Sequence, residues 1–284
     1  MSERDGFIDV HVHPPTKEFL IDAGGEHVAA AARKFGHTIE LKSIDQMLQE
    51  YSQAGVDRLV LFAWDAETAS HRRRVSNEFV SKIVERHPDR IVGFASVDPH
   101  KKSAARELSN AVRELKLQGL KLHPQAQAFE PNDPKYYPIY SKCVELGVPI
   151  TFHTGSTYWG AGLAGGGGLK LKFSDPMLLD DVAANFPDLK IIMAHPGWPW
   201  QDEQLAIATH KSNVFIDLSG WSPKYFQPLL VTYMTKMIPE KFLFGTDYPM
   251  LTPERWLRDF GELKISSEVR QMVLRDNAKR LLRL

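Results

Sequence analysis

Eight short apolar runs, rich in β-branched residues, recur along this chain and alternate with segments of helical periodicity. Such alternation is typical of parallel α/β proteins, because each helix carries the chain back to begin the next strand. We predict strands at residues 7–12, 58–63, 91–97, 119–123, 148–153, 189–194, 214–218 and 242–246. The helices that we predict span residues 43–51, 76–86, 103–117, 134–146, 177–186, 254–263 and 267–281.

Two topologies fit eight alternating units: a closed (β/α)8 barrel and an open, doubly wound sheet. An open sheet that binds a dinucleotide carries a Gly-rich phosphate-binding motif after its first strand, and this chain has none there. Polar residues follow nearly every predicted strand, at the end where a barrel forms its active site. We therefore predict one α/β domain over residues 1–284, a (β/α)8 barrel, with residues 14–42 as a candidate lid insertion.

Composition excludes several classes of protein. Lys+Arg and Asp+Glu number 35 each, so the chain lacks the basic field of a sequence-independent nucleic-acid binder. No apolar run reaches membrane-spanning length, and the polar residues 1–5 are untypical of a signal peptide. The single cysteine, Cys143, excludes an intrachain disulfide. We expect a cytoplasmic protein that acts on a small molecule.

A pair of histidines ends the first strand. His11 and His13 are two residues apart, so on a strand both point to one face while Val10 and Val12 point to the other. Imidazoles in this arrangement can bind one divalent metal. Further polar or aromatic residues follow the other strands, and histidines follow four different strands, which favours a metal site: Trp64, Asp65, Asp98, Lys121, His123, His153, His195, Ser219 and Asp247.

Several motifs together resemble the amidohydrolase superfamily, and in particular the branch that includes aminocarboxymuconate semialdehyde decarboxylase and the resorcylate decarboxylases. The motifs are Asp-Val-His-Val-His, Thr-Phe-His-Thr-Gly, Met-Ala-His-Pro-Gly, Phe-Gly-Thr-Asp-Tyr-Pro and Asp-Asn-Ala-Lys-Arg-Leu-Leu, at residues 9–13, 151–155, 193–197, 244–249 and 276–282. They occur in the family's order along the whole chain. The resemblance implies a metal-dependent barrel enzyme, and it also makes a homodimer an expectation.

Carried over residue by residue, the resemblance implies one metal ion, usually Zn²⁺, bound by His11, His13, His153 and Asp247. Three neutral nitrogens and one carboxylate suit zinc and leave a position for water or substrate. Asp247 would also shuttle a proton, and the resemblance implies that His195 is a catalytic histidine. We predict that His195 is a general acid or base rather than a ligand.

The predicted fourth strand carries two candidate site residues. In binuclear members of the superfamily a carboxylated lysine on this strand bridges two metals, so Lys121 is either such a bridge or a buried cation paired with an acidic neighbour. Lys121 and His123 are both candidate substrate contacts, and for His123 we prefer a contact with a substrate carboxylate or carbonyl. The Arg72–Arg74 run is either a solvated helix start or a contact for an anionic substrate tail.

Aromatic residues that follow the strands predict a flat, apolar pocket for a planar substrate. We expect Trp256 to lie in the core instead. The candidates for the pocket wall are Trp64, Tyr158, Trp159, Trp198 and Trp221.

Two reactions fit these residues. We favour a hydrolase, in which a zinc-bound water cleaves a carbonyl-containing substrate, with aromatic and β-ketoacyl-CoA compounds as candidates. The complete His11-x-His13 pair and the glycine-rich residues 165–172, which are similar to those of a hydrolase subgroup, support this choice. The alternative is a non-oxidative decarboxylase of an aromatic or unsaturated acid. A second alternative is a metal-free lactonase or a ligand-binding barrel.

Overall fold

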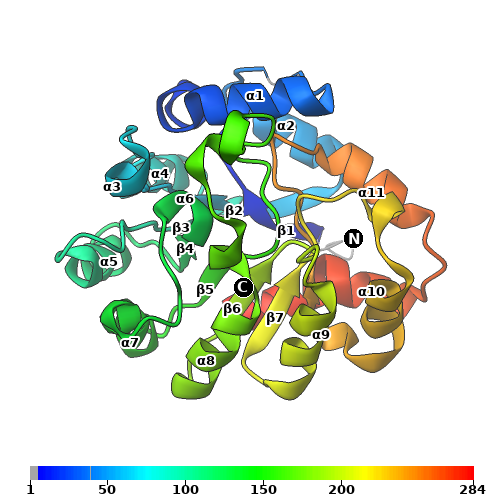
Figure 1. The fold of residues 1–284 in the computed structure, drawn as a ribbon. Helices are drawn as coiled ribbons and strands as arrows, with labels where there is room; N and C mark the ends of the chain where they lie inside the picture. Colours follow the sequence, from blue (N-terminus) through cyan, green and yellow to red (C-terminus); the bar gives the residue numbers. More distant parts are fainter. Residues whose placement is uncertain (1–5, 39) are drawn as a thin grey trace.

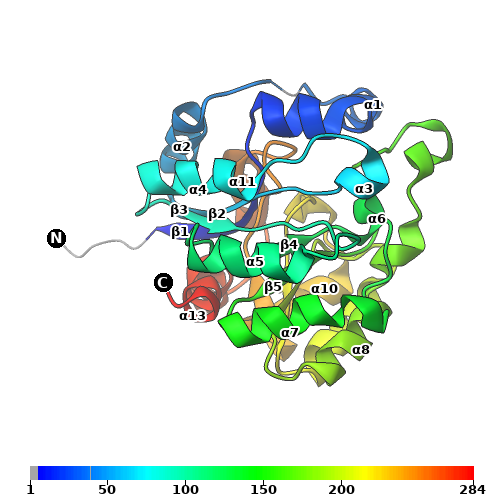
Figure 2. The ribbon, with the colours of Figure 1, turned by 90° about the vertical axis from the view of Figure 1, so that its left-hand side faces the viewer.

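The computed structural model describes residues 6–38 and 40–284 as a barrel of parallel strands surrounded by helices (Figures 1 and 2). Residues 1–5, whose polarity we judged untypical of a signal peptide, lie outside the described residues. The strands follow one another around the barrel as β1 (Phe7–Val12), β2 (Val56–Phe62), β3 (Ile91–Phe94), β4 (Leu120–Leu122), β5 (Ile150–His153), β6 (Ile191–Ala194), β7 (Val214–Asp217) and β8 (Phe242–Leu243). The predicted (β/α)8 barrel is confirmed.

Backbone hydrogen bonds join the two sheets, β1–β3 and β4–β8, into one barrel. Between β3 and β4, the amide of Ala95 donates to the carbonyl of Gly119 at 2.8 Å. Between β8 and β1, the amide of Val10 donates to the carbonyl of Phe244 at 2.9 Å, and His13 donates to Tyr248 at 2.9 Å. These bonds satisfy groups that would otherwise form open sheet edges.

The outer ring consists of helices that the structure places at α1 (Gly25–Phe35), α2 (Ile44–Gln53), α3 (Glu67–Ser70), α4 (Asn77–Arg86), α5 (Ala104–Arg113), α6 (Pro124–Gln127), α7 (Tyr137–Leu146), α8 (Met177–Asn185), α9 (Gln201–His210), α10 (Pro228–Thr232), α11 (Pro253–Gly261), α12 (Ser267–Gln271) and α13 (Asn277–Leu282). The predicted capping box at Ser43 forms as expected. We did not predict helix α9. Its buried face includes the polar residues Gln201 and Gln204, so its apolar residues do not recur with a clear helical period.

The first strand departs from simple alternation. Ile8 and Val10 pack in the barrel interior with Ala278 and Leu282 of α13, whereas Val12 packs in the outer core. The prediction that Val10 and Val12 share a face is therefore wrong. A register shift between Asp9 and Val12 in the β1–β2 pairing accounts for the change, since a bulge re-aims the side chains that follow it.

The described part of the predicted lid insertion, residues 14–38 and 40–42, contains a π-helical turn, η1 (Glu18–Gly24), followed by α1. Arg72 holds this segment in place, because its guanidinium donates to the carbonyls of Ala23 at 2.9 Å and Ile21 at 2.6 Å. Arg72 is therefore occupied by the backbone of this segment rather than directed at a substrate tail. The movement of this segment as a lid remains a prediction.

A buried polar cluster fastens the β8–β1 seam to α2. Asp9 accepts hydrogen bonds from the hydroxyls of Tyr51 at 3.0 Å and Thr246 at 2.6 Å, and from the amides of His11 and Thr246. Tyr51 and Asp9 are fully buried. Because buried polar groups cost free energy unless they are paired, this cluster depends on each of its donors.

Removing one donor from this cluster should lower stability. We expect Tyr51→Phe to lower the free energy of unfolding by about 1–3 kcal/mol, because Asp9 loses a buried hydrogen-bond donor. Urea denaturation followed by circular dichroism measures the change. Tyr233→Phe is the matched control, since Tyr233 is half-buried and lies outside the cluster. An equal, small effect of both substitutions would contradict the assignment.

Candidate active site

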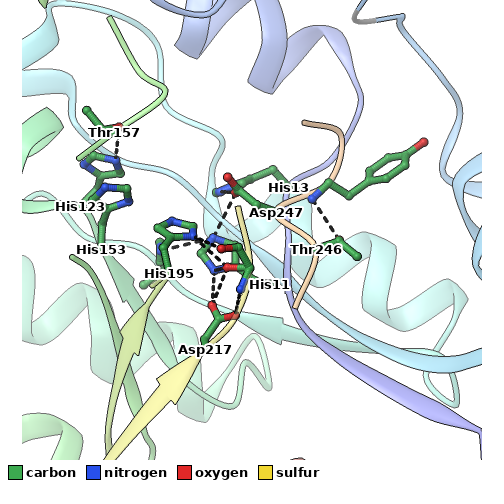
Figure 3. Close-up of polar contacts among 12 residues, drawn as sticks. His11, His13, His123, His153, Thr157, His195, Asp217, Thr246 and Asp247 are labelled. Carbon is green, nitrogen blue, oxygen red and sulfur yellow. Dashed lines mark hydrogen bonds and ion pairs between the residues drawn. The ribbon is translucent and has the colours of Figure 1, made fainter. Parts of the chain in front are cut away.

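Three side chains converge at the C-terminal end of the barrel. His11 and His13 come from the end of β1 and its following turn, and Asp247 comes from the turn after β8 (Figure 3). Nε2 of His11 lies 3.3 Å from Oδ1 of Asp247, and Nε2 of His13 lies 3.6 Å from the same oxygen. One ligand atom from each of the three residues lies within 4.8 Å of the other two.

The second nitrogen of His11 is held from below by Asp217, the last residue of β7. Nδ1 of His11 donates to Oδ2 of Asp217 at 2.6 Å, and both side chains are buried. A carboxylate that accepts from one ring nitrogen fixes the tautomer and leaves the other nitrogen with a free lone pair. Nε2 of His11 therefore presents its lone pair to the space between Asp247 and Nζ of Lys121, which lie 3.3 Å and 3.4 Å from it.

This arrangement fits a bound cation. When Asp247 is ionised, its carboxylate oxygen and the lone pair of His11 face each other as two acceptors, and a positive ion between them stabilises this arrangement. Ligands at the zinc–ligand bond lengths of a tetrahedral site lie about 3.3 Å apart, close to the two distances observed. Burial lowers the pKa values of His11 and His13 well below the ordinary value, which keeps both imidazoles neutral as metal ligands must be.

His195 follows β6 and stands beside this group. Its Nδ1 donates to the carbonyl of Ser219 at 3.0 Å, which leaves Nε2 as an acceptor. Burial lowers the pKa of His195 to about 4, and the charge of Lys121 adds to this effect. Gly220 makes the close approach possible, since a Cβ atom there would lie 2.6 Å from Nδ1 of His195. His195 is thus neutral at neutral pH, with a lone pair on Nε2.

The backbone is strained at the two predicted catalytic residues. His195 has a φ of 74° and Asp247 has a φ of 66°, backbone values that residues other than glycine rarely adopt. Such strain concentrates at functional sites, where the surrounding structure enforces it. Without a bound ion, burial raises the pKa of Asp247 well above its ordinary value, and this favours the protonated form of the carboxyl group.

His153 lies near the three convergent residues but outside their compact group. Its ring stacks on His123 at 3.9 Å and meets His195 at 4.7 Å, and its Nε2 lies 3.1 Å from the carbonyl oxygen of Ser156 (Figure 3). His153 remains a prediction as the fourth metal ligand.

Lys121 is buried in the barrel, with its Nζ 3.4 Å from Nε2 of His11 and 5.1 Å from the ring centre of Phe62. Burial lowers the pKa of Lys121 to about 8, although the charges of Asp247 and Asp217 oppose this effect. The structure gives Lys121 no direct ion pair with an acid among the described residues. Its carboxylation remains untested.

Two adjoining cavities open above these groups. The inner chamber, about 40 Å³, contains the convergent residues and is lined by His11, His13, Phe19, Trp64, Lys121, His123, His153, Thr157, Tyr158, Trp159, His195, Asp247 and Met250. The outer chamber, about 370 Å³, shares six of these residues (His153, Thr157, Tyr158, His195, Asp247 and Met250) and adds Phe35, His37, Ser156, Trp198, Gly220, Trp221, Ser222, Tyr225, Leu251 and Arg255. All the predicted substrate contacts line one chamber or the other.

The structure sorts the predicted aromatic residues by depth. Trp64 and Trp159 stack on each other at 4.4 Å beside the inner chamber, while Trp198 and Trp221 line the outer one. Trp256 is fully buried in the core, as expected. The Gly165–Gly168 run lines neither chamber; instead Gly167 lies against His27 of α1, with the ring nitrogen 3.3 Å from its carbonyl oxygen.

Sequence reasoning missed several residues of this site, among them Asp217, His37 and Arg255. Asp217 lies inside an apolar strand, and an acidic residue in such a run is a signal of a buried, paired carboxylate that could have identified it. His37 and Arg255 carry no comparable signal, because α1 and α11 bring them to the outer chamber only in the folded protein.

Comparison with known proteins places this chain in a family. The family model described as amidohydrolase matches residues 8–284, so the chain belongs to the amidohydrolase family and is an enzyme of that superfamily. A 2-amino-3-carboxymuconate-6-semialdehyde decarboxylase of Dictyostelium discoideum is 25% identical over 170 residues, which cover 54% of this chain and 47% of that protein, about half its length. Decarboxylase orsB of Emericella nidulans is 27% identical over 301 residues, covering 86% and 87% of the two chains.

Solved structures share the fold. An uncharacterised TIM-barrel protein of Bordetella bronchiseptica matches with a TM-score of 0.82 at 24% identity and covers 98% of each chain. A dihydroxybenzoic acid decarboxylase of Polaromonas sp., solved with manganese and 2-nitroresorcinol, matches with a TM-score of 0.74 at 20% identity, covering 99% of this chain and 97% of that one. None of the helices formed by residues 6–38 and 40–284 is long and apolar enough to cross a membrane.

Asp217 should control metal affinity without touching the ion. We expect Asp217→Asn to weaken binding of a divalent metal by about 10–100-fold, because His11 loses the carboxylate that orients it and raises its basicity. Competition with a chelator of known affinity measures the change, and Asp202→Asn, on the exposed side of α9, is the control. Unchanged affinity in Asp217→Asn would contradict this role.

Proposed function

We propose that this protein is a metal-dependent decarboxylase that removes carbon dioxide from an aromatic carboxylic acid. The names of both curated relatives support this choice, because each is called a decarboxylase. They favour the decarboxylase alternative over the hydrolase that the sequence first suggested. The β-ketoacyl-CoA substrate also loses support, since the glycine run expected to bind its phosphates lines neither chamber.

One observation carries the proposal: an acid and a base face the same boundary between a small polar chamber and a larger aromatic one. Asp247, whose pKa is raised by burial, and His195, a neutral base, line both chambers. The inner chamber, about 40 Å³, fits a carboxylate rather than a ring, while the aromatic outer chamber fits the ring. The reacting bond of an aromatic acid would then lie between the acid and the base.

The residues of this boundary divide the reaction between them. Nε2 of His195 accepts a hydrogen bond from a ring hydroxyl, which increases electron density at the carbon that carries the carboxylate. Oδ1 of Asp247 faces His11 and His13, which leaves Oδ2 to hold a proton. That proton passes to the ring carbon, a C–H bond forms, the C–C bond breaks, and carbon dioxide leaves.

The candidate metal ligands are His11, His13 and Asp247, with His153 as the predicted fourth. A divalent ion, when bound there, supplies a Lewis acid that fixes and polarises the oxygens of a substrate carboxylate. Zn²⁺ suits the nitrogen-rich ligand set, and the manganese in a structural neighbour makes Mn²⁺ the other candidate. The convergence of these ligands speaks against a metal-free lactonase or a binding barrel.

A product assay tests the proposal. Protein loaded with Zn²⁺ or Mn²⁺ should convert a hydroxybenzoic acid to the corresponding phenol and carbon dioxide, which chromatography and headspace mass spectrometry measure. We expect His195→Asn to reduce kcat by about 10²–10⁴-fold, because the base is lost. His210→Asn, on the exposed end of α9, is the control. Turnover of esters or amides with no release of carbon dioxide from any aromatic acid would restore the hydrolase.

The pH dependence of kcat should reflect the buried state of His195. Since the pKa of His195 is lowered to about 4, its lone pair is lost only as the pH falls toward that value. We expect no loss of kcat attributable to this histidine between pH 7 and about 5.5, measured as carbon dioxide release with saturating substrate. A decline with a midpoint near the ordinary histidine pKa of about 6.5, abolished in His195→Asn, would show that the base is not held as described.

A further inference from the structure

The outer chamber contains a cationic group that the proposed reaction does not use. Arg255 is the sole lysine or arginine among the residues that line this chamber in the described part of the chain. It lies in the first turn of α11, and it is absent from the lining of the inner chamber. The cation therefore stands where the part of a substrate remote from the reacting carboxylate would lie.

The guanidinium of Arg255 is only loosely held by the protein. Its Nε lies 4.0 Å from Oδ2 of Asp259, and that oxygen already accepts a hydrogen bond from Ser222 at 2.6 Å. Nε of Arg258 donates a hydrogen bond to the other carboxylate oxygen of Asp259, Oδ1, at 3.3 Å. Arg255 thus keeps most of its donors for another partner, and a planar guanidinium matches a carboxylate with two parallel hydrogen bonds.

Two further polar groups line the same chamber without partners. The hydroxyl of Tyr158 and Nδ1 of His37 are buried atoms with no hydrogen bond among the described residues. Their rings stack at 5.8 Å with an interplanar angle of 9°. Because an unpaired buried polar group costs free energy, both are prepared to bond a ligand that enters the chamber.

We propose that Arg255, with Tyr158 and His37, forms a subsite for a second carboxylate on the substrate. This inference rests on the proposed decarboxylation of an aromatic acid and narrows its substrate class to aromatic acids that carry another acidic group. The reacting carboxylate enters the inner chamber, the ring lies between the aromatic walls of Trp198 and Trp221, and the second carboxylate reaches Arg255.

Ligand binding to the metal-loaded protein tests the subsite. The probes are 2-hydroxybenzoate and its derivatives with a second carboxylate at ring carbon 3, 4 or 5, together with the methyl ester of each second carboxylate. We expect at least one diacid to bind about tenfold tighter than 2-hydroxybenzoate or its own ester, measured by calorimetry. The ester separates the effect of charge from the effect of size.

Substitution of Arg255 should remove this preference and nothing else. In Arg255→Gln the diacid should bind no tighter than its ester, while the affinity for 2-hydroxybenzoate stays as in the unaltered protein. Arg258→Gln is the matched control, since Arg258 lies on the same helix, is exposed and lines neither chamber. A preference that survives in Arg255→Gln, or its absence in the unaltered protein, overturns the subsite.

The same samples keep this inference distinct from the proposed function. Release of carbon dioxide from a monoacid and a diacid alike, with no dependence on Arg255, leaves the decarboxylase intact and removes the subsite. Tight binding of a diacid that depends on Arg255, without release of carbon dioxide from any probe, keeps the subsite and removes the decarboxylase. Thermal melting of each variant verifies that it is folded.

Discussion

A backbone hydrogen bond at the last seam of the barrel makes the site possible. The amide of Asp247 donates to the carbonyl of His11 at 2.9 Å, so the turn after β8 rests directly on the end of β1. This bond brings a carboxylate from near the end of the chain to a histidine pair near its beginning. The buried cluster of Asp9, Tyr51 and Thr246 fastens the same seam from outside. The contacts that close the barrel between β8 and β1 therefore also bring the site residues together.

Burial determines the charge states at this site. The same desolvation that lowers the pKa values of the histidines raises those of Asp247 and Asp217. The imidazoles are therefore neutral and can bind a metal through a lone pair, while the raised pKa of Asp247 favours the form of this carboxyl group that carries a proton. Isolated charges would be costly here, and His11 accordingly lies 2.6 Å from Asp217 and 3.3 Å from Asp247.

Much of the fold could be predicted from the sequence, because apolar periodicity and helix-capping residues are both local features of the chain. Apolar runs and capping residues predicted all eight strands and most of the outer helices, although α1, α9 and α10 are among those not predicted. The positions of His11, His195 and Asp247 at or after strand ends predicted where they would meet. The bulge in β1 was not predictable, since it depends on pairing with β2. It decides that His11 faces the barrel interior beside Val10.

The cationic residues near the site show what cannot be predicted from local sequence patterns. The sequence drew attention to Arg72–Arg74, because three adjacent arginines stand out, yet Arg72 binds the backbone of η1 and Arg74 pairs with Asp65 at 3.4 Å and Glu107 at 3.8 Å. Arg255 is unremarkable in sequence, and it lines the outer chamber only because the fold places the first turn of α11 there. Such residues are found by where the fold places them.

Metal content tests the central claim most directly. The account predicts about one divalent ion per chain by elemental mass spectrometry, in protein purified without chelator or added metal, and none in a His11→Ala, His13→Ala double variant that remains folded. Two ions per chain would contradict the single site and indicate Lys121 as a carboxylated bridge. No ion in the unaltered protein, or equal content in the double variant, would contradict the site itself.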